Sequence, residues 1–139
     1  MTTKTVLPQL QPVGLVGLGF MGQGITACLL AHGFDVIGYD QSAANARRSV
    51  AHIRGTLEDL ARRKAMPRSR PRGWEKRLTV ASSLHELKPC RFVIECIKEN
   101  LALKRTLFAE LETVVKPGAI IASNTSSLPI SLLQAKRRN

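Results

Sequence analysis

The feature that most constrains the fold is a set of three closely spaced glycines, Gly17, Gly19 and Gly22. They follow a short apolar run at residues 13–18 and precede apolar residues that recur at helical spacing over residues 21–30. A tight passage from strand to helix favours glycine, which can adopt backbone conformations and close approaches that a Cβ forbids. The pattern therefore predicts a strand, a tight turn and a helix.

A second predicted strand, residues 34–39, follows a helix stop at His32-Gly33 and ends at Asp40. Glycines in this arrangement followed by an acid at the next strand end are typical of dinucleotide binding. The predicted cofactor-binding residues here are Gly17, Leu18, Gly19, Phe20, Met21, Gly22 and Asp40. The amides at the helix start would face the pyrophosphate, and Asp40 would accept from the adenosine ribose. Its charge would repel a 2′-phosphate, which predicts NAD over NADP. A glycine turn without a ligand is the alternative.

The rest of the chain continues this alternation of strand and helix. Predicted strands cover residues 78–81, 91–97 and 119–122, and residues 66–73 form a predicted loop. Predicted helices carry the apolar stripes Val50, Ile53, Leu57, Leu60 and Leu103, Leu107, Leu111, Val114, Val115. The expected fold is α/β, a Rossmann-type doubly wound, mainly parallel sheet that is incomplete at its C-terminal edge. Residues 13–139 form this domain after a flexible segment, residues 1–12.

Composition bounds the class of protein. A chain of 139 residues that is 44% hydrophobic and 22% charged is typical of one soluble globular domain. It has no apolar run of roughly 18 residues, as a membrane span requires, and no signal-like start. The three cysteines form no Cys-x-x-Cys pair. We expect a reducing, cytoplasmic compartment, no membrane and no metal site.

Three segments together resemble the L-3-hydroxyacyl-CoA dehydrogenase family. They are Gly-Leu-Gly-Phe-Met-Gly-Gln-Gly-Ile from residue 17, Val-Ile-Glu-Cys-Ile-Lys-Glu-Asn-Leu-Ala-Leu-Lys from residue 93, and Ala-Ser-Asn-Thr-Ser-Ser-Leu from residue 122. The second and third are more distinctive than the glycine loop. The resemblance implies an NAD-binding domain of an enzyme that oxidises L-3-hydroxyacyl-CoA to the 3-ketoacyl-CoA.

The resemblance also implies roles for single residues. Glu99 and Lys104 match positions that contact the nicotinamide side of NAD, and Ser126 matches a serine between nicotinamide and the substrate hydroxyl. Thr56 and Arg63 match positions that touch the CoA moiety. From the residues alone, Glu99 could be a surface acid at a helix start, Lys104 a solvated base and Ser126 the N-cap of a helix starting near Pro129. Glu95 interrupts an apolar strand, and is either a buried, hydrogen-bonded acid or solvent-facing.

The net charge of +11 is concentrated locally. Eleven of the 21 Lys and Arg residues lie between residues 43 and 77, against three acids. A solvated helix face is the first interpretation, and attraction of CoA phosphates is the second. Nucleic acid is disfavoured as a partner, because Trp74 is the only aromatic residue in this stretch.

The sequence departs from the family pattern in one important respect. The family's catalytic histidine, set in Gly-Leu-His-Phe-Phe-Asn-Pro, and its helical C-terminal domain have no counterpart, and His32, His52 and His85 lie in the wrong elements. We therefore expect no catalytic residue in this chain, and a truncated or split protein. Expected partners are NAD, an acyl-CoA, and either a second copy or the missing domain. A non-catalytic NAD-binding module, a carnitine or sugar-acid dehydrogenase domain and a basic binding protein that reuses the fold remain alternatives.

Overall fold

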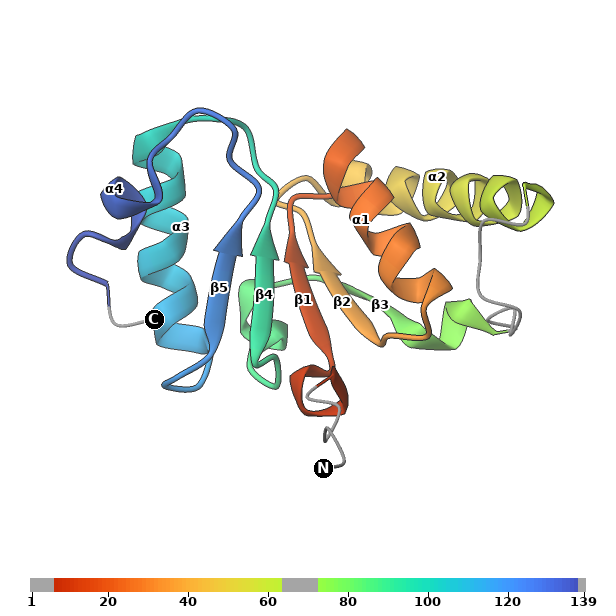
Figure 1. Cartoon of the computed structure of the whole chain (residues 1–139), viewed down its shortest axis with the longest axis horizontal. Coiled ribbons are helices and arrows are strands. Elements are labelled where there is room, and N and C mark those ends of the chain that lie inside the picture. Colours follow the sequence, from red (N-terminus) through yellow and green to blue (C-terminus); the bar gives the residue numbers. More distant parts are fainter. Residues whose placement is uncertain (1–6, 64–72, 138–139) are drawn as a thin grey trace, which may run out of the picture.

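A computed structural model describes residues 7–63 and 73–137 of the chain. Its centre is a five-stranded, wholly parallel sheet with the order β3-β2-β1-β4-β5 (Figure 1). The strands are β1 (Val13–Val16), β2 (Val36–Tyr39), β3 (Leu78–Ala81), β4 (Phe92–Glu95) and β5 (Ile120–Ser123). This confirms the predicted α/β fold with a doubly wound, parallel sheet. The strand at residues 119–122 was predicted one residue too early, and those at 34–39 and 91–97 were predicted too long.

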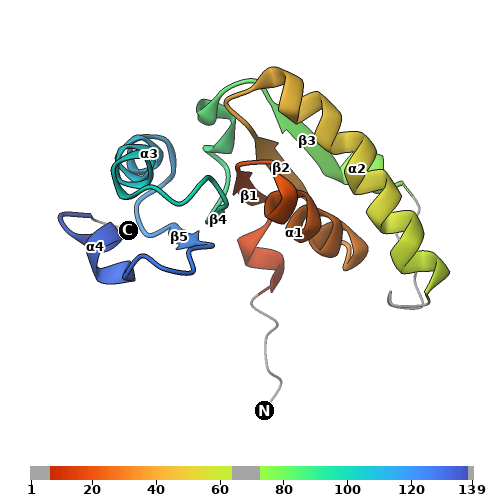
Figure 2. The same ribbon diagram turned by 90° about the horizontal axis from the view of Figure 1, so that it is seen from above.

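Helices cover both faces of the sheet, as a doubly wound fold requires. They are α1 (Phe20–Ala31), α2 (Ala43–Arg62), α3 (Leu101–Val114) and α4 (Ile130–Gln134). Seen from above, α1 and α2 lie on one side of the sheet and α3 and α4 on the other (Figure 2). Ser42 caps α2 by accepting from the Asn45 amide, and the Asn100 side chain caps α3 through the Leu103 amide.

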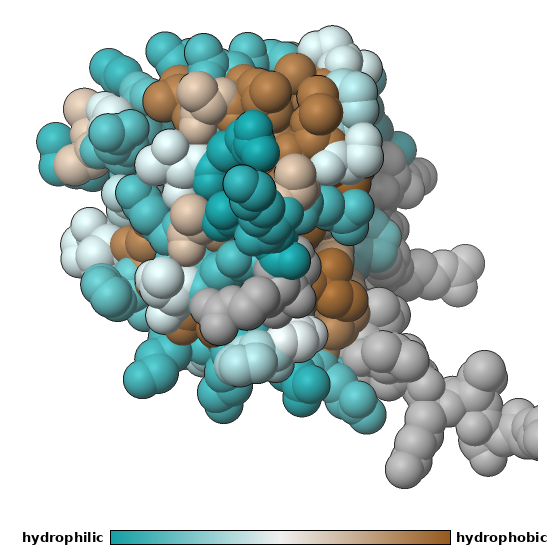
Figure 3. Space-filling model, turned by 90° about the vertical axis from the view of Figure 1, so that its left-hand side faces the viewer, coloured by the Kyte–Doolittle hydropathy of each residue, from teal (hydrophilic) through white to brown (hydrophobic). Residues whose placement is uncertain are grey.

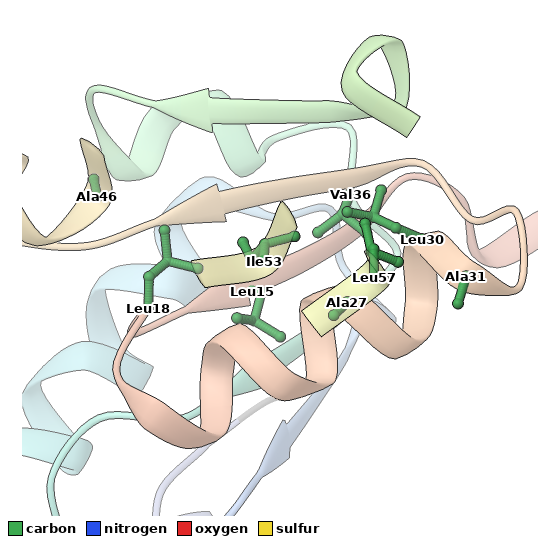
Figure 4. Packing of buried hydrophobic residues seen from close by; sticks show 9 residues of the cluster. All are labelled: Leu15, Leu18, Ala27, Leu30, Ala31, Val36, Ala46, Ile53 and Leu57. Atoms are coloured by element: carbon green, nitrogen blue, oxygen red, sulfur yellow. The ribbon is translucent and has the colours of Figure 1, made fainter. Parts of the chain in front are cut away.

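Two hydrophobic clusters bind these layers together. The first joins the sheet to α1 and α2 (Figure 4), and its buried residues are Leu15, Leu18, Ala27, Leu30, Ala31, Val36, Ala46, Ile53 and Leu57. The second joins the sheet to α3 around Val93, Leu107 and Leu111. Leu103, which belongs to the predicted apolar stripe of this helix, lies outside the core and is 45% exposed. Exclusion of these side chains from water supplies the main drive to assemble both layers.

The register of the strands collects their carboxyl ends at one edge. Val16 lies opposite both Tyr39 and Glu95, and Glu95 lies opposite Ser123. The loops that follow these residues therefore open onto the same crevice. Ligands of open parallel sheets bind at this edge, where the strand order reverses between β1 and β4.

One edge of the sheet is formed by β5, which pairs only with β4 in the described part of the chain. Ile120 on this strand is 53% exposed, and Ile130 and Leu132 of α4 are 47% and 44% exposed. Figure 3 views the molecule from the side of α3 and α4, and apolar surface there interrupts the hydrophilic surroundings. An exposed apolar edge strand offers unpaired backbone groups to another chain.

Three expectations need adjustment at the ends and the connecting loop. Leu7–Leu10 form a 3-10 helix and the Gln11 side chain accepts from the Asp35 amide, so part of the predicted flexible segment lies against the sheet. The predicted loop at residues 66–73 lies outside the described residues except for Gly73. Helix α4 has five residues and its N-cap is Pro129, so the alternative of Ser126 as the N-cap is wrong. None of the described helices is long and apolar enough to cross a membrane.

Candidate functional site

The glycine loop has the geometry that its sequence predicted. Gly17 has a φ of +93° and donates its amide to the Tyr39 carbonyl at 2.8 Å. A Cβ built at Gly22 would overlap the carbonyl oxygen of Gly17. These two contacts show that Gly17 makes the turn and that Gly22 lets α1 approach it closely.

The start of α1 presents free space and backbone donors. No atom lies within 4 Å of a Cβ built at Gly19, and Gly19 is the N-cap of α1 without a side-chain cap. Helix N-termini of this kind carry unpaired amides and a partial positive charge that suit a phosphate. Phe20 is 90% exposed, whereas the Leu18 side chain is buried in the core. A direct contact of Leu18 with a ligand stays a prediction, since the whole residue is 1% exposed.

Asp40 lies beside this loop at the end of β2. Its carboxylate accepts from the Leu18 amide at 2.9 Å and from the Ser42 amide at 2.8 Å. A carboxylate has about four acceptor positions, so two remain for hydroxyl groups of a ligand. Asp40 thus ties the glycine loop to β2 and keeps capacity for a ribose.

A cavity of about 460 Å³ opens directly beside Asp40. Its lining residues come from the ends of β1, β2 and β4 and from one face of α3: Val16, Gly17, Gly19, Tyr39, Asp40, Gln41, Asn45, Leu84, Cys96, Ile97, Lys98, Leu103, Thr106, Leu107 and Glu110. The volume lies within the usual range for small-molecule sites. Sequence reasoning did not identify Thr106 and Glu110. Their three- and four-residue spacing from Leu103 and Leu107 was the available signal, because it places all four on one helix face.

The other half of the crevice is organised around Glu99. Its carboxylate accepts from the Thr125 hydroxyl at 2.5 Å, from the Ser126 amide at 3.1 Å, and from the Ser127 amide and hydroxyl, each at 3.0 Å. The Thr125 hydroxyl, followed by the Ser127 amide, holds the pKa of Glu99 well below its usual range. Glu99 is therefore more than a surface acid at a helix start, since it orders the loop that contains Ser126.

Lys104 and Glu95 lie beneath this loop, and both side chains are 0% exposed. The Lys104 Nζ is 2.9 Å from each oxygen of Glu95 and 3.2 Å from Oε2 of Glu99. The alternative of Lys104 as a solvated base is wrong, and the open question about Glu95 is answered in favour of a buried, hydrogen-bonded acid. Lys104 is buried below the surface of the crevice. Its link to that surface is the ion pair with Glu99, whose side chain is 32% exposed.

Thr56 and Arg63 lie elsewhere on the domain, Thr56 on α2 and Arg63 at the C-cap of this helix. Thr56 lines a mainly apolar groove of about 700 Å³ between α1 and α2, which Phe20 and Met21 of the glycine loop also line. Its hydroxyl donates to the His52 carbonyl at 3.0 Å. Arg63 is exposed and pairs with Asp59 at 2.7 Å. The groove adjoins the crevice, and a contact of either residue with CoA stays a prediction.

None of the three histidines, the residue type expected to accept the proton, lines the cavity beside Asp40. His32 and His52 line the groove between α1 and α2, and His85 is absent from the cavity lining. Cys96 does line the cavity, but burial, followed by the charge of Glu95, raises its pKa to about 11. In the described chain no three His, Cys, Asp or Glu side chains gather as metal ligands require.

A strand order that reverses at a glycine loop, with an acid at the end of β2, defines the class of dinucleotide-binding domains. The family described as "3-hydroxyacyl-CoA dehydrogenase, NAD binding domain" matches residues 12–139. The chain belongs to this family, whose cofactor is NAD.

Individual relatives agree with this assignment. The chain is 37% identical over 126 residues to a 3-hydroxybutyryl-CoA dehydrogenase of Bradyrhizobium diazoefficiens, covering 91% of this chain and 43% of that protein. It is 36% identical to an L-carnitine dehydrogenase of Streptomyces griseus, covering 89% of this chain and 36% of that protein. The crystal structure of 3-hydroxybutyryl-CoA dehydrogenase from Escherichia coli K12 superposes with a TM-score of 0.85 at 33% identity, covering 94% of this chain and 28% of that one. The chain thus spans less than half the length of these relatives.

Proposed function

We propose that the chain binds NAD across the crevice as the nucleotide half of an oxidoreductase for a 3-hydroxyacyl-CoA thioester. One observation carries the proposal: the glycine loop, Asp40 and the Glu99-ordered loop open onto the same carboxyl edge of the sheet. A dinucleotide in such a fold lies across the point where the strand order reverses. The adenosine half then lies near β2, and the nicotinamide half lies over the ends of β4 and β5.

The residues divide the binding of NAD between them. The amides at the start of α1 face the pyrophosphate, and the two free acceptor positions of Asp40 receive ribose hydroxyls. The Asp40 charge disfavours a 2′-phosphate. Ser126 is exposed on the Glu99-ordered loop, where its hydroxyl can face the nicotinamide and a substrate hydroxyl. Bound NAD supplies the hydride acceptor, and the chain supplies its orientation.

The proposed substrate rests on the names of the relatives and on the basic residues in and around α2. Several relatives are named for 3-hydroxybutyryl-CoA. Thr56 lies on α2 and Arg63 directly follows this helix, which contributes four of the eleven basic residues between 43 and 77, and CoA is strongly anionic. We place the CoA along this helix, with the acyl end toward Ser126.

Titration calorimetry and a turnover assay test the proposal together. The chain should bind NADH, yet oxidise 3-hydroxybutyryl-CoA only slowly, because none of its three histidines lines the cavity beside Asp40, where one could serve as general base. General-base help is commonly worth roughly 10²–10⁴ in rate. Failure to bind NADH would overturn the proposed function. Fast turnover would leave the cofactor site intact and show that another group accepts the proton.

A non-catalytic NAD-binding module is the second candidate, and the position of the three histidines favours it. Because one relative is an L-carnitine dehydrogenase, L-carnitine is the alternative substrate to test. Competition between 3-hydroxybutyryl-CoA and L-carnitine for the NADH-loaded chain separates these possibilities. Binding of the CoA thioester alone supports the first proposal, and binding of neither supports the module.

We further propose that the protein resides in a reducing compartment such as the cytoplasm, and that a partner covers the β5 edge. The three cysteines are free thiols. The surface that this partner would cover is apolar, since it contains the exposed Ile120, Ile130 and Leu132. Such a surface suits a second copy or a further domain.

A further inference from the structure

A line of charged side chains connects the centre of the sheet to the loop that contains Ser126. It begins at Glu95 in the fourth strand, continues to Lys104 on α3 and ends at Glu99. Two of the three side chains are fully buried, and the Glu99 side chain is 32% exposed. Burial of this ion pair adds little net stability, because desolvation of both charges opposes their attraction. We therefore expect the pair to have a further role.

Every contact of the buried acid joins a different part of the fold. The Glu95 carboxylate accepts from the Ile97 amide at 2.6 Å, from Lys104 at 2.9 Å and from the Ser123 hydroxyl at 2.5 Å. These partners belong to the loop after β4, to α3 and to the end of β5. Such a fully satisfied polar network fixes the relative positions of the three elements.

The loop at residues 124–127 is held at its start by the backbone of Glu95 and at its end by the Glu99 side chain. The Asn124 amide donates to the Glu95 carbonyl at 2.8 Å, and Glu99 accepts from the backbone of Ser126 and Ser127. Lys104 contacts both acids, so it couples the buried end of the line to the exposed end. The position of the Ser126 backbone therefore depends on a lysine that no ligand in the crevice can touch directly.

We propose that Glu95 and Lys104 are positioning residues, which set the affinity for the nicotinamide half of the cofactor by ordering the loop at residues 124–127. This inference rests on the proposed function. Asp40 and the glycine loop lie on the adenosine side of the crevice, and within the described chain no hydrogen bond joins them to the side chains of Glu95, Lys104 or Glu99. Loss of the line should therefore weaken ligands that carry nicotinamide and spare those that end at the second ribose. The physical cause is the entropy of ordering the loop on binding.

The experiment compares NADH with ADP-ribose, which lacks the nicotinamide. The double variant Glu95→Gln/Lys104→Met removes both buried charges while conserving side-chain volume, so no buried charge remains unpaired. We expect the affinity for NADH to fall about tenfold and the affinity for ADP-ribose to stay within about twofold. Amide exchange at Ser126 and Ser127 should become faster in the same variant, with urea unfolding recorded to show that the fold persists.

A matched control removes an ion pair at the other end of the sheet. Asp35 and Arg77 pair at 3.3 Å, before the first residues of β2 and β3. Asp35→Asn/Arg77→Met should leave both affinities and the exchange of Ser126 unchanged. If the double variant fails to fold, Ser123→Ala removes one contact of Glu95 and should show the same selective loss at smaller size.

The outcomes separate this inference from the proposed function. If the unaltered chain binds neither NADH nor ADP-ribose, the proposed function fails. If it binds both and the variants weaken both equally, or weaken neither, the NAD site stands and the positioning role is refuted. A selective loss for NADH with faster exchange at Ser126 supports it.

Discussion

The two halves of the crevice are held in shape by different interactions. On the β1–β2 side, the loop conformation depends on backbone: a positive φ at Gly17, the close approach at Gly22 and amides at a helix start. On the β4–β5 side, it depends on buried charge, with Lys104 between Glu95 and Glu99. Backbone geometry tolerates few residue types but is local, whereas a charge network requires side chains from distant segments to meet.

This difference predicts how each half responds to substitution. Changes at the glycines should act on ligand binding or on the close approach of α1, while changes in the charge network should act first on stability. Breaking a buried pair on one side leaves an uncompensated charge, which is among the costliest single changes in a protein.

The largest expected effect is that of Lys104→Met on stability. Removal of the ammonium leaves Glu95 charged and 0% exposed, so the free energy of unfolding should fall by about 3–5 kcal/mol. Urea unfolding measures this change. Arg105→Met, on the adjacent and exposed position of α3, should change it by less than about 0.5 kcal/mol. A loss below about 1 kcal/mol for Lys104→Met would show that the network is not a principal support of this half.

Gly19→Val should act on binding instead. A Cβ at this position meets no protein atom, so the fold should survive, but the added branches occupy the approach to the α1 amides. Loss of two charge-assisted hydrogen bonds to a pyrophosphate lowers NADH affinity by about a hundredfold or more. Gly55→Ala on α2, also in open space, is the control and should bind NADH normally. Normal binding by Gly19→Val would mean that the glycine loop is only structural.

A smaller, pH-dependent effect is expected at Glu99. Its pKa lies below the ordinary 4.5 when folded, because the Thr125 hydroxyl and the Ser127 amide favour the carboxylate. A depressed pKa adds stability above the unfolded value, and this is lost as the pH falls below about 4.5. Glu99→Gln should therefore be less stable than the unaltered chain near neutral pH, and the difference should shrink in acid. A difference that is constant between pH 7 and pH 3 would contradict the assigned hydrogen bonds.

The smallest effect concerns association rather than stability or binding. Ile120 is 53% exposed on the β5 edge, and a lysine there should discourage edge-to-edge pairing. Size-exclusion chromatography with light scattering, run over a concentration series, should show self-association of the unaltered chain and less of it for Ile120→Lys. Thr79→Lys on the opposite edge strand, β3, is the control and should not change it. A strictly monomeric unaltered chain would show that the β5 edge does not recruit a second copy.

The same contrast explains what the sequence could predict. The turn at Gly17, the contact at Gly22 and the strand order follow from local patterns whose structural context is a single strand–turn–helix unit. The buried state of Lys104 did not follow, since its partners Glu95 and Glu99 lie nine and five residues earlier and meet it only when α3 packs on the sheet. The hydrogen bonds of Glu99 with Thr125 and Ser127 were equally hard to predict, because they join segments 26 to 28 residues apart. Leu103 borders the cavity, whereas Leu107 and Leu111 of the same apolar stripe belong to the second cluster, a division that helical spacing alone does not reveal.

The central claim, that the crevice binds NAD with its adenosine ribose at Asp40, is tested most directly by the ratio of NADH to NADPH affinity. Calorimetric titration of the unaltered chain should show tighter binding of NADH, because the Asp40 carboxylate repels a 2′-phosphate at this position. Asp40→Asn keeps an acceptor for the Leu18 or Ser42 amide and removes the charge, so the ratio should fall toward one while NADH binding weakens. Tighter binding of NADPH by the unaltered chain, or a ratio that Asp40→Asn leaves unchanged, would contradict the account.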